Sequence, residues 1–516
     1  MKGLKMMRSL VMVLVLCVQG LLEVQAKPDF GVNLPITSSG KVSQAVLGAK
    51  SVLVAVDDNT PLTVEANYNG LQQLADIMTT IAAIPVQIGN ELIPLVTSLV
   101  TDGSGDVTAA FAPVFAKITE VADAITTKIP LANTAIKALF QARFNSIGLD
   151  YIPDQLTDGF DRITDGLADL TAKLQVLKGA IEAAVTEMVV DLSPAILKKH
   201  VKPALIYNLV FAVNQLKAYI PEVKYTIDST LENINLADDY LVLLYQASSD
   251  SVTTNTALIN SVRTVTDGIQ TRVKEYLDLY GSEYDSLKTS AKALTNIATA
   301  PDISNMFAAL DAFTTTYESL ATTRYPALAT QMQTLLDTMA TALGGSSTPG
   351  QITSGLLDSL ILTVIENGKF AQFCFNKYLG LVFGFLTSLS DSAGLCFDKE
   401  ITRLQYLQDS LLEFTDMLPF DYEMTEVELT VCDNLTPQDK LDECVLLLSG
   451  FYDELSVQFS LKVQYLFELI EAETVASANR FLICVELVKI NLVEMSEPTL
   501  TDEIRQCALG GPTADD

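Results

Sequence analysis

The chain has 516 residues, of which 49% are apolar, so it is long enough and apolar enough to bury a large core. It carries 63 acidic and 33 basic residues, a formal net charge of −30. A polyanion repels nucleic acid and acidic membrane surfaces, which disfavours both as partners. The acidic residues are spread along the chain, and no calcium-binding loop motif occurs among them.

Residues 1–26 have the pattern of a secretory signal peptide. Three basic residues precede an apolar run over 9–22, which is shorter than the roughly 20 residues of a membrane span. Compact residues at positions 24 and 26 predict cleavage before Lys27. No later segment is expected to span a membrane, the most apolar being 378–387. We therefore expect a secreted, extracellular protein with 30 basic and 62 acidic residues after cleavage, a formal charge of −32.

Apolar residues recur at helical spacing almost throughout residues 27–343, which predicts an all-α body. Apolar stripes of this kind cover 258–298 and 310–343, and Pro326 is expected to bend or break the second of them. Each stripe gives a helix one apolar face, as in a coiled coil or a narrow bundle of long helices. The only strand-like run, 51–56, also fits a helix. The clearest stripe steps by three and four through Phe160, Ile163, Leu167, Leu170, Leu174, Leu177, Ile181, Ala184 and Met188.

Residues 344–350, Gly-Gly-Ser-Ser-Thr-Pro-Gly, form the stretch richest in turn-forming residues, and we predict a linker there. It would separate the cysteine-free body, 27–343, from a cysteine-containing helical domain over 351–507. A polar tail, 508–516, follows. No sequence motif recurs at a fixed period, so a repeat protein is not predicted.

Six of the seven cysteines lie between residues 351 and 507, and the seventh lies in the signal peptide. An even number of cysteines in an exported chain predicts three disulfide bonds. Fifteen pairings are possible. A helical hairpin centred near residue 430 would favour Cys374–Cys484 and Cys432–Cys444, and would leave Cys396 for Cys507. The six cysteines are Cys374, Cys396, Cys432, Cys444, Cys484 and Cys507.

The segment from Phe370 to Cys507 resembles the TsetseEP-type secreted domain of insects. Its run Cys374-Phe-Asn-Lys-Tyr-Leu379 is similar to the Cys-Phe-x-x-Tyr-Leu start of that domain, and further cysteines follow. The Glu-Pro repeat of the family's namesake is missing, with Glu497-Pro498 a single instance. The resemblance implies an extracellular or gut protein of an insect, and it carries over no catalytic residues.

His200, the only histidine, would be needed by any Ser/His/Asp or Cys/His catalytic site, but it lies in the basic run 197–202. A zinc site needs several histidines or free thiolates, which oxidised cysteines cannot supply. Neither a phosphate-binding loop nor a dinucleotide-binding motif occurs. Paired acids, as in glycosidases, stay open because acids are abundant, although the absence of tryptophan disfavours a sugar-binding cleft. We predict that the protein is not an enzyme and holds no cofactor or metal.

Asn434-Leu-Thr436 is the only N-glycosylation sequon, and we predict that it lies in a loop. The favoured function is a non-enzymatic structural or interaction protein of an extracellular fluid, gut lumen or matrix. Its partners would be other proteins or further copies of itself, since apolar seams can be buried by association. The alternative is a carrier of lipids or other hydrophobic ligands inside a helical bundle.

Overall fold

The computed structural model describes residues 29–54, 62–144, 150–188, 191–342, 354–417 and 424–512. Helices make up nearly all of these residues, and their only β-type pairing is an isolated bridge between Asp29 and Val32. The predicted all-α fold of long helices is therefore confirmed. The predicted signal peptide (1–26) and linker (344–350) lie outside the described residues, as does the end of the polar tail.

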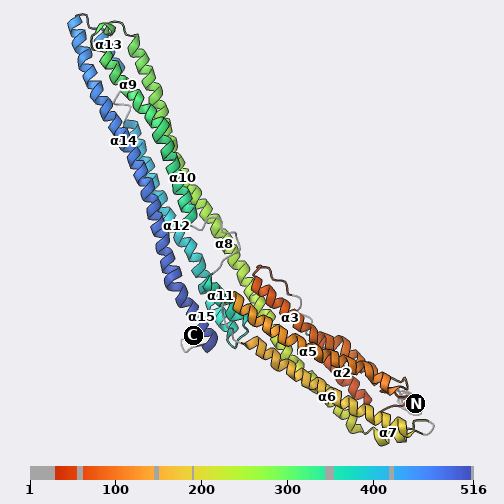
Figure 1. The fold of residues 1–516 in the computed structure, drawn as a ribbon. Coiled ribbons are helices and arrows are strands. Elements are labelled where there is room, and N and C mark those ends of the chain that lie inside the picture. Colours follow the sequence, from red (N-terminus) through yellow and green to blue (C-terminus); the bar gives the residue numbers. More distant parts are fainter. Residues whose placement is uncertain are drawn as a thin grey trace, which may run out of the picture. The chain divides into compact units, whose positions relative to one another are not determined.

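The chain forms two compact units, whose helices are drawn in chain colours in Figure 1. Unit 1 comprises Met1–Leu243, Ser354–Leu379 and Thr501–Asp516, and unit 2 comprises Leu244–Thr353 and Gly380–Leu500. Three helices contribute residues to both units: α8 (Pro203–Ala293), α12 (Ala371–Met417) and α15 (Glu497–Gly510).

Unit 1 is built on the pairing of α5 with α6, and α3 and α11 pack against α5. The predicted stripe on α6 is buried from Phe160 to Ala184, whereas its last predicted member, Met188, follows the end of the helix and is exposed. Ser193 accepts a hydrogen bond from the Ile196 amide at 3.3 Å and so caps the next helix, α7. The further helices of this unit are α2 (Ser39–Val54), α3 (Asn69–Gln87), η2 (Ile88–Leu92), α4 (Ile93–Val100), α5 (Val107–Phe144), α6 (Tyr151–Glu187), α7 (Pro194–His200) and α11 (Gly355–Ile365).

In unit 2, α9 and α10 run along α14, a helix of 52 residues (Figure 1). Pro326 does not break the predicted stripe: a π-helical turn, η4, precedes it and joins α9 to α10. Such a turn accommodates the missing amide of proline without ending the helix. The elements are η3 (Ile297–Thr299), α9 (Ile303–Ser319), η4 (Leu320–Arg324), α10 (Tyr325–Ala342), α13 (Thr425–Asp433), α14 (Gln438–Lys489) and η6 (Ile490–Ser496).

The two units divide the chain differently from the predicted body (27–343) and cysteine domain (351–507). Helices α9 and α10 come from the predicted body, yet they pack against α14 from the predicted cysteine domain. The reason is that an apolar stripe needs a partner, and α14 buries its own stripe against theirs. The chain passes from unit 2 to unit 1 between Thr353 and Ser354, close to the predicted linker, but it also crosses between the units at three other points, so the linker does not divide the chain into a body and a cysteine domain.

Two described helical stretches are long and apolar enough to cross a membrane, where the sequence analysis expected none. They are Gly70–Val100, with half of its most apolar window buried, and Ala371–Met417, with 19% of that window buried. Length and composition alone select these stretches. Core helices of proteins in water meet the same criterion, so the finding does not show insertion into a bilayer.

Candidate functional site

The six cysteines between residues 351 and 507 form three disulfide bonds, as the sequence predicts. Cys374 pairs with Cys507 in unit 1, and the Cα atoms are 5.8 Å apart. Unit 2 holds the other two pairs, Cys396–Cys484 and Cys432–Cys444, with Cα–Cα distances of 5.9 and 5.7 Å. Each unit is therefore cross-linked within itself.

Of the three predicted pairs, Cys432–Cys444 is correct, and the other two are wrong because their partners are exchanged. The structure pairs Cys374 with Cys507 and Cys396 with Cys484. Their spacing gives the reason: 22 residues separate the first cysteines of these pairs (374 to 396), and 23 separate their partners (484 to 507). Nested pairing between antiparallel segments requires such equal spacing. The midpoint of both pairs lies near residue 440 rather than 430, so the assumed hairpin was centred too early.

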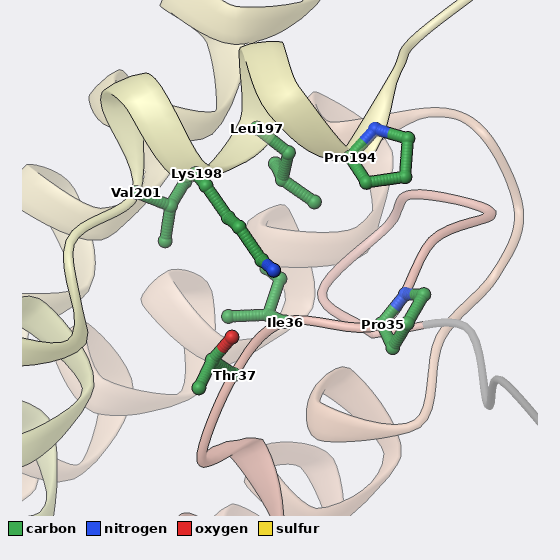
Figure 2. A pocket seen from close by; sticks show the side chains of 7 residues that line it. All are labelled: Pro35, Ile36, Thr37, Pro194, Leu197, Lys198 and Val201. Carbon is green, nitrogen blue, oxygen red and sulfur yellow. The ribbon is translucent and has the colours of Figure 1, made fainter. Parts of the chain in front are cut away.

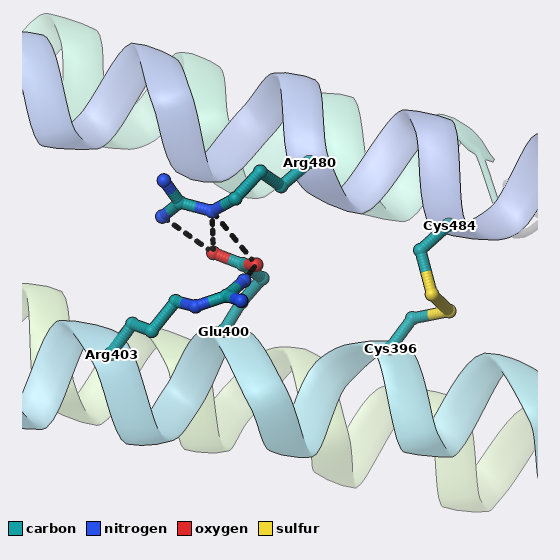
Figure 3. Close-up of a disulfide and its surroundings, with 5 residues drawn as sticks. All are labelled: Cys396, Glu400, Arg403, Arg480 and Cys484. Atoms are coloured by element: carbon teal, nitrogen blue, oxygen red, sulfur yellow. Dashed lines mark hydrogen bonds and ion pairs between the residues drawn. A yellow bond between two sulfur atoms is a disulfide. The ribbon is translucent and has the colours of Figure 1, made fainter.

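A buried ion pair lies one helical turn from Cys396–Cys484 (Figure 3). Glu400 on α12 is only 2% exposed, although it is a carboxylate. Arg480 on α14 donates from Nε to Oε1 of Glu400 at 3.1 Å and from Nη2 to Oε2 at 2.9 Å. Arg403, one turn along α12, donates to the same carboxylate. Two guanidinium groups thus neutralise one buried carboxylate, which removes most of the cost of burying it.

The ion pair and the disulfide fix the same register between α12 and α14. Arg480 also donates to Glu473 on its own helix, and the carboxylate of Glu400 raises the pKa of the Arg480 guanidinium, which stays charged. The rings of Phe397 and Phe481 lie between these links, with their centroids 4.5 Å apart. A one-residue slip of either helix would break the links together. Sequence reasoning missed this cluster, although Glu400 and Arg480 each lie four residues from a paired cysteine.

Asn434 follows the end of α13, two residues after Cys432, and is exposed; the sequon lies in the short connection to α14, as predicted. Its side-chain amide donates to the carbonyl of Thr430 at 2.8 Å. Next to it, the carboxylate of Asp433 accepts from the backbone amides of Asn296 and Ile297 at 2.7 and 2.8 Å. The sequon therefore lies at an exposed helix end that a disulfide and three hydrogen bonds hold in place.

His200 lies at the end of α7, where it and Lys199 both pair with the carboxylate of Glu187. Both contacts lower the pKa of the Glu187 carboxyl, and the hydrogen bond from Lys199 has the larger effect. No serine, threonine or cysteine side chain is shown bonded to the imidazole among the described residues. Across the described ranges, no group of three His, Cys, Asp or Glu side chains is placed to hold a metal ion.

The cavities of the described surface include two of a few hundred Å³. The first, of about 230 Å³, lies beside α7, and the Lys198 side chain reaches across it towards Thr37 (Figure 2). The second, of about 320 Å³, lies between α10 and α14, near Leu482. Drug-sized ligands occupy about 300–1,000 Å³ of mostly apolar space. The first cavity is lined by Pro35, Ile36, Thr37, Pro194, Leu197, Lys198 and Val201, several of which are exposed.

A column of aromatic side chains lies at one level of the core of unit 2. Tyr280 and Tyr284 lie one turn apart on α8 with ring centroids separated by 5.9 Å, and both are 1% exposed. Phe459 of α14 stacks on Tyr280 at 4.8 Å, and Phe313 of α9 stacks on Tyr284 at 5.5 Å. Gly281 allows this packing, because a Cβ there would lie 2.6 Å from the ring of Tyr317. At this level, the space between the helices is filled by protein side chains.

In comparisons with known proteins, no family model, no curated protein and no solved structure matches this chain. The likeness of 370–507 to the TsetseEP-type domain accordingly stays a prediction, and the functional argument rests on the helices, their cross-links and their exposed faces.

Proposed function

We propose that the protein is a secreted, non-enzymatic structural or interaction protein of an extracellular fluid, gut lumen or matrix. One observation carries this proposal: almost all of the described residues lie in long helices, which pack together by their apolar faces and are cross-linked by disulfide bonds. Helix α14 alone has 52 residues, about 78 Å at 1.5 Å per residue. Such helices present long, rigid faces on which another protein can dock.

Two features support secretion. Disulfide bonds persist in oxidising compartments, and all six cysteines of the predicted mature chain are paired. The N-terminal sequence also has the pattern of a signal peptide. The proposal includes the extracellular setting that the resemblance to the TsetseEP-type domain implies.

The carrier of hydrophobic ligands is the less favoured function. A carrier needs an apolar cavity large enough for its ligand. In unit 2, the corresponding space holds the rings of Tyr280, Tyr284, Phe313 and Phe459. Packing of this kind supports an interaction protein rather than a carrier.

The two functions predict different compositions for the native protein. We expect residues 27–516, secreted from a eukaryotic host, to carry no stoichiometric lipid in native mass spectrometry or after organic extraction. Sedimentation over a range of protein concentrations is expected to show association. One bound lipid per chain that survives purification would contradict this proposal and favour the carrier.

We also propose that Asn434 carries an N-linked glycan. Its exposed position at the end of α13 gives an oligosaccharide access to solvent. Enzymatic removal of N-glycans should lower the mass of the secreted protein by one glycan, and an Asn434→Gln variant should show no such change. Equal masses before and after treatment of the unsubstituted protein would contradict occupancy.

A further inference from the structure

The cavity beside α7 combines an apolar floor with one positive charge. Its floor is made by Ile36, Leu197 and Val201, which are 5%, 3% and 6% exposed. Lys198 crosses above this floor, and its ammonium group points towards the hydroxyl of Thr37 (Figure 2). Among the described residues that line the cavity, Lys198 is the only charged one. The cavity therefore offers an apolar surface, a cation and a hydroxyl to the same small ligand.

Lys198 differs from the next two residues because it has no acidic partner. Lys199 and His200 both pair with Glu187, whereas no ion pair of Lys198 occurs among the residues that the structure describes. An ammonium group beside low-dielectric walls attracts an anion more strongly than the same group in open water. The charge of Lys198 is thus available to a ligand that carries an anionic group.

Hydrogen bonds hold both walls of the cavity in place. The Ile36 amide donates to Oδ2 of Asp29 at 2.7 Å, which fixes the loop that carries Ile36. On the other wall, the Val201 amide donates to the Leu197 carbonyl at 2.8 Å and keeps these two side chains one turn apart. A ligand that enters such a cavity does not have to order its walls, so less of its binding energy is lost.

We propose that this cavity binds a small monocarboxylic acid with an apolar tail. The carboxylate lies against Lys198 and Thr37, and the tail lies on the apolar floor. The volume sets the size of the ligand: a molecule of liquid water takes about 30 Å³, so the 230 Å³ of the cavity hold roughly eight groups of that size. Hexanoate matches this size. The inference goes beyond the proposed interaction function and does not depend on it, because no partner protein takes part.

The first test compares three ligands on the unsubstituted protein. Isothermal titration calorimetry of residues 27–516 with sodium hexanoate, at constant ionic strength, should give a Kd on the order of 1 mM for a ligand this small. Hexanamide keeps the tail without the charge, and acetate keeps the charge without the tail. Each should bind at least about fivefold more weakly than hexanoate, because an exposed ion pair contributes little without the apolar contact.

The second test places the ligand in this cavity. Lys198→Met removes the charge and keeps an apolar stem, and we expect it to raise the Kd for hexanoate about fivefold. Lys202→Met is the matched control, because Lys202 is an exposed lysine of the same basic run that does not line the cavity. It should leave the Kd unchanged. Thr37→Trp places an indole at the exposed rim, which should fill the cavity and abolish binding although Lys198 is kept.

Circular dichroism should show equal helix content in the parent protein and the three variants. No saturable binding of hexanoate up to about 10 mM would overturn the inference. Equal Kd values for the parent protein and Lys198→Met would also overturn it, as would binding that survives Thr37→Trp. Equal affinities for acetate and hexanoate would show that the apolar floor plays no part. Each of these failures would leave the proposed interaction function intact, because the association of chains is measured separately by sedimentation.

Discussion

Replacing Cys396 and Cys484 together by alanine is expected to lower the free energy of unfolding of unit 2 by about 4–5 kcal/mol. This disulfide spans 88 residues of chain, and a cross-link that closes a long loop removes the most entropy from the unfolded state. The loss should be visible as faster hydrogen exchange in peptides from α9 and α10, which pack against α14. Titration of thiols in the denatured, unreduced parent protein should find none.

The matched control is the other disulfide of unit 2. Cys432–Cys444 spans only 12 residues, so its replacement by two alanines should cost about 3 kcal/mol. We therefore expect the larger loss of stability for Cys396–Cys484. Local packing at the tight turn would suggest the opposite order, with the larger loss for Cys432–Cys444. An equal or larger loss for the short loop would show that strain or local contacts, rather than loop entropy, govern these cross-links.

Phe459→Ala should destabilise unit 2 by about 3–5 kcal/mol, because it removes a buried ring from a closely packed core. Phe459 is 1% exposed, and its ring contacts those of Tyr280 and Phe313, with centroids 4.8 and 5.3 Å away. Neighbouring side chains are not free to move into the cavity, because stacking partners hold their rings in place. Urea unfolding followed by circular dichroism would measure the loss.

Phe451→Ala is the control for this prediction, because it makes the same chemical change on the same helix. Phe451 is 53% exposed, so we expect its truncation to cost about 1 kcal/mol or less. If the two substitutions lowered the stability equally, the side of α14 that holds Phe459 would not be the side that packs into the core.

Periodicity was sufficient to predict the helices, because the signal repeats many times along each element. The stripe on α6 is an example: all its members from Phe160 to Ala184 are buried as expected. Only its end was misplaced, at Met188, where the apolar spacing continues by one step beyond the last helical residue. Pro326 was expected to bend or break its stripe, because a rule based on proline alone does not foresee the π-helical turn that accommodates it.

The partners of each stripe could not be predicted. An apolar stripe indicates which face of a helix is buried, but it does not indicate which other helix that face packs against. The packing of α9 and α10 on α14 joins residues more than a hundred positions apart and crosses the predicted linker. The long-range cysteine pairs failed for a related reason: an error of about ten residues in the hairpin centre exchanges their partners. Glu400 and Arg480 carry no pattern of their own, and only the correct register brings them together.

The buried tyrosines make the fold sensitive to alkali. Tyr284 and Tyr452 in unit 2 and Tyr240 in unit 1 are nearly inaccessible, and burial raises the pKa of each phenol above its ordinary value near 10. Below about pH 10 these groups are neutral in both states. Above it, the unfolded chain loses their protons while the folded chain keeps them, so each withdraws about 1.4 kcal/mol of stability per pH unit. The folded state of this polyanion therefore loses stability above about pH 10 because of phenols that lie inside its cores.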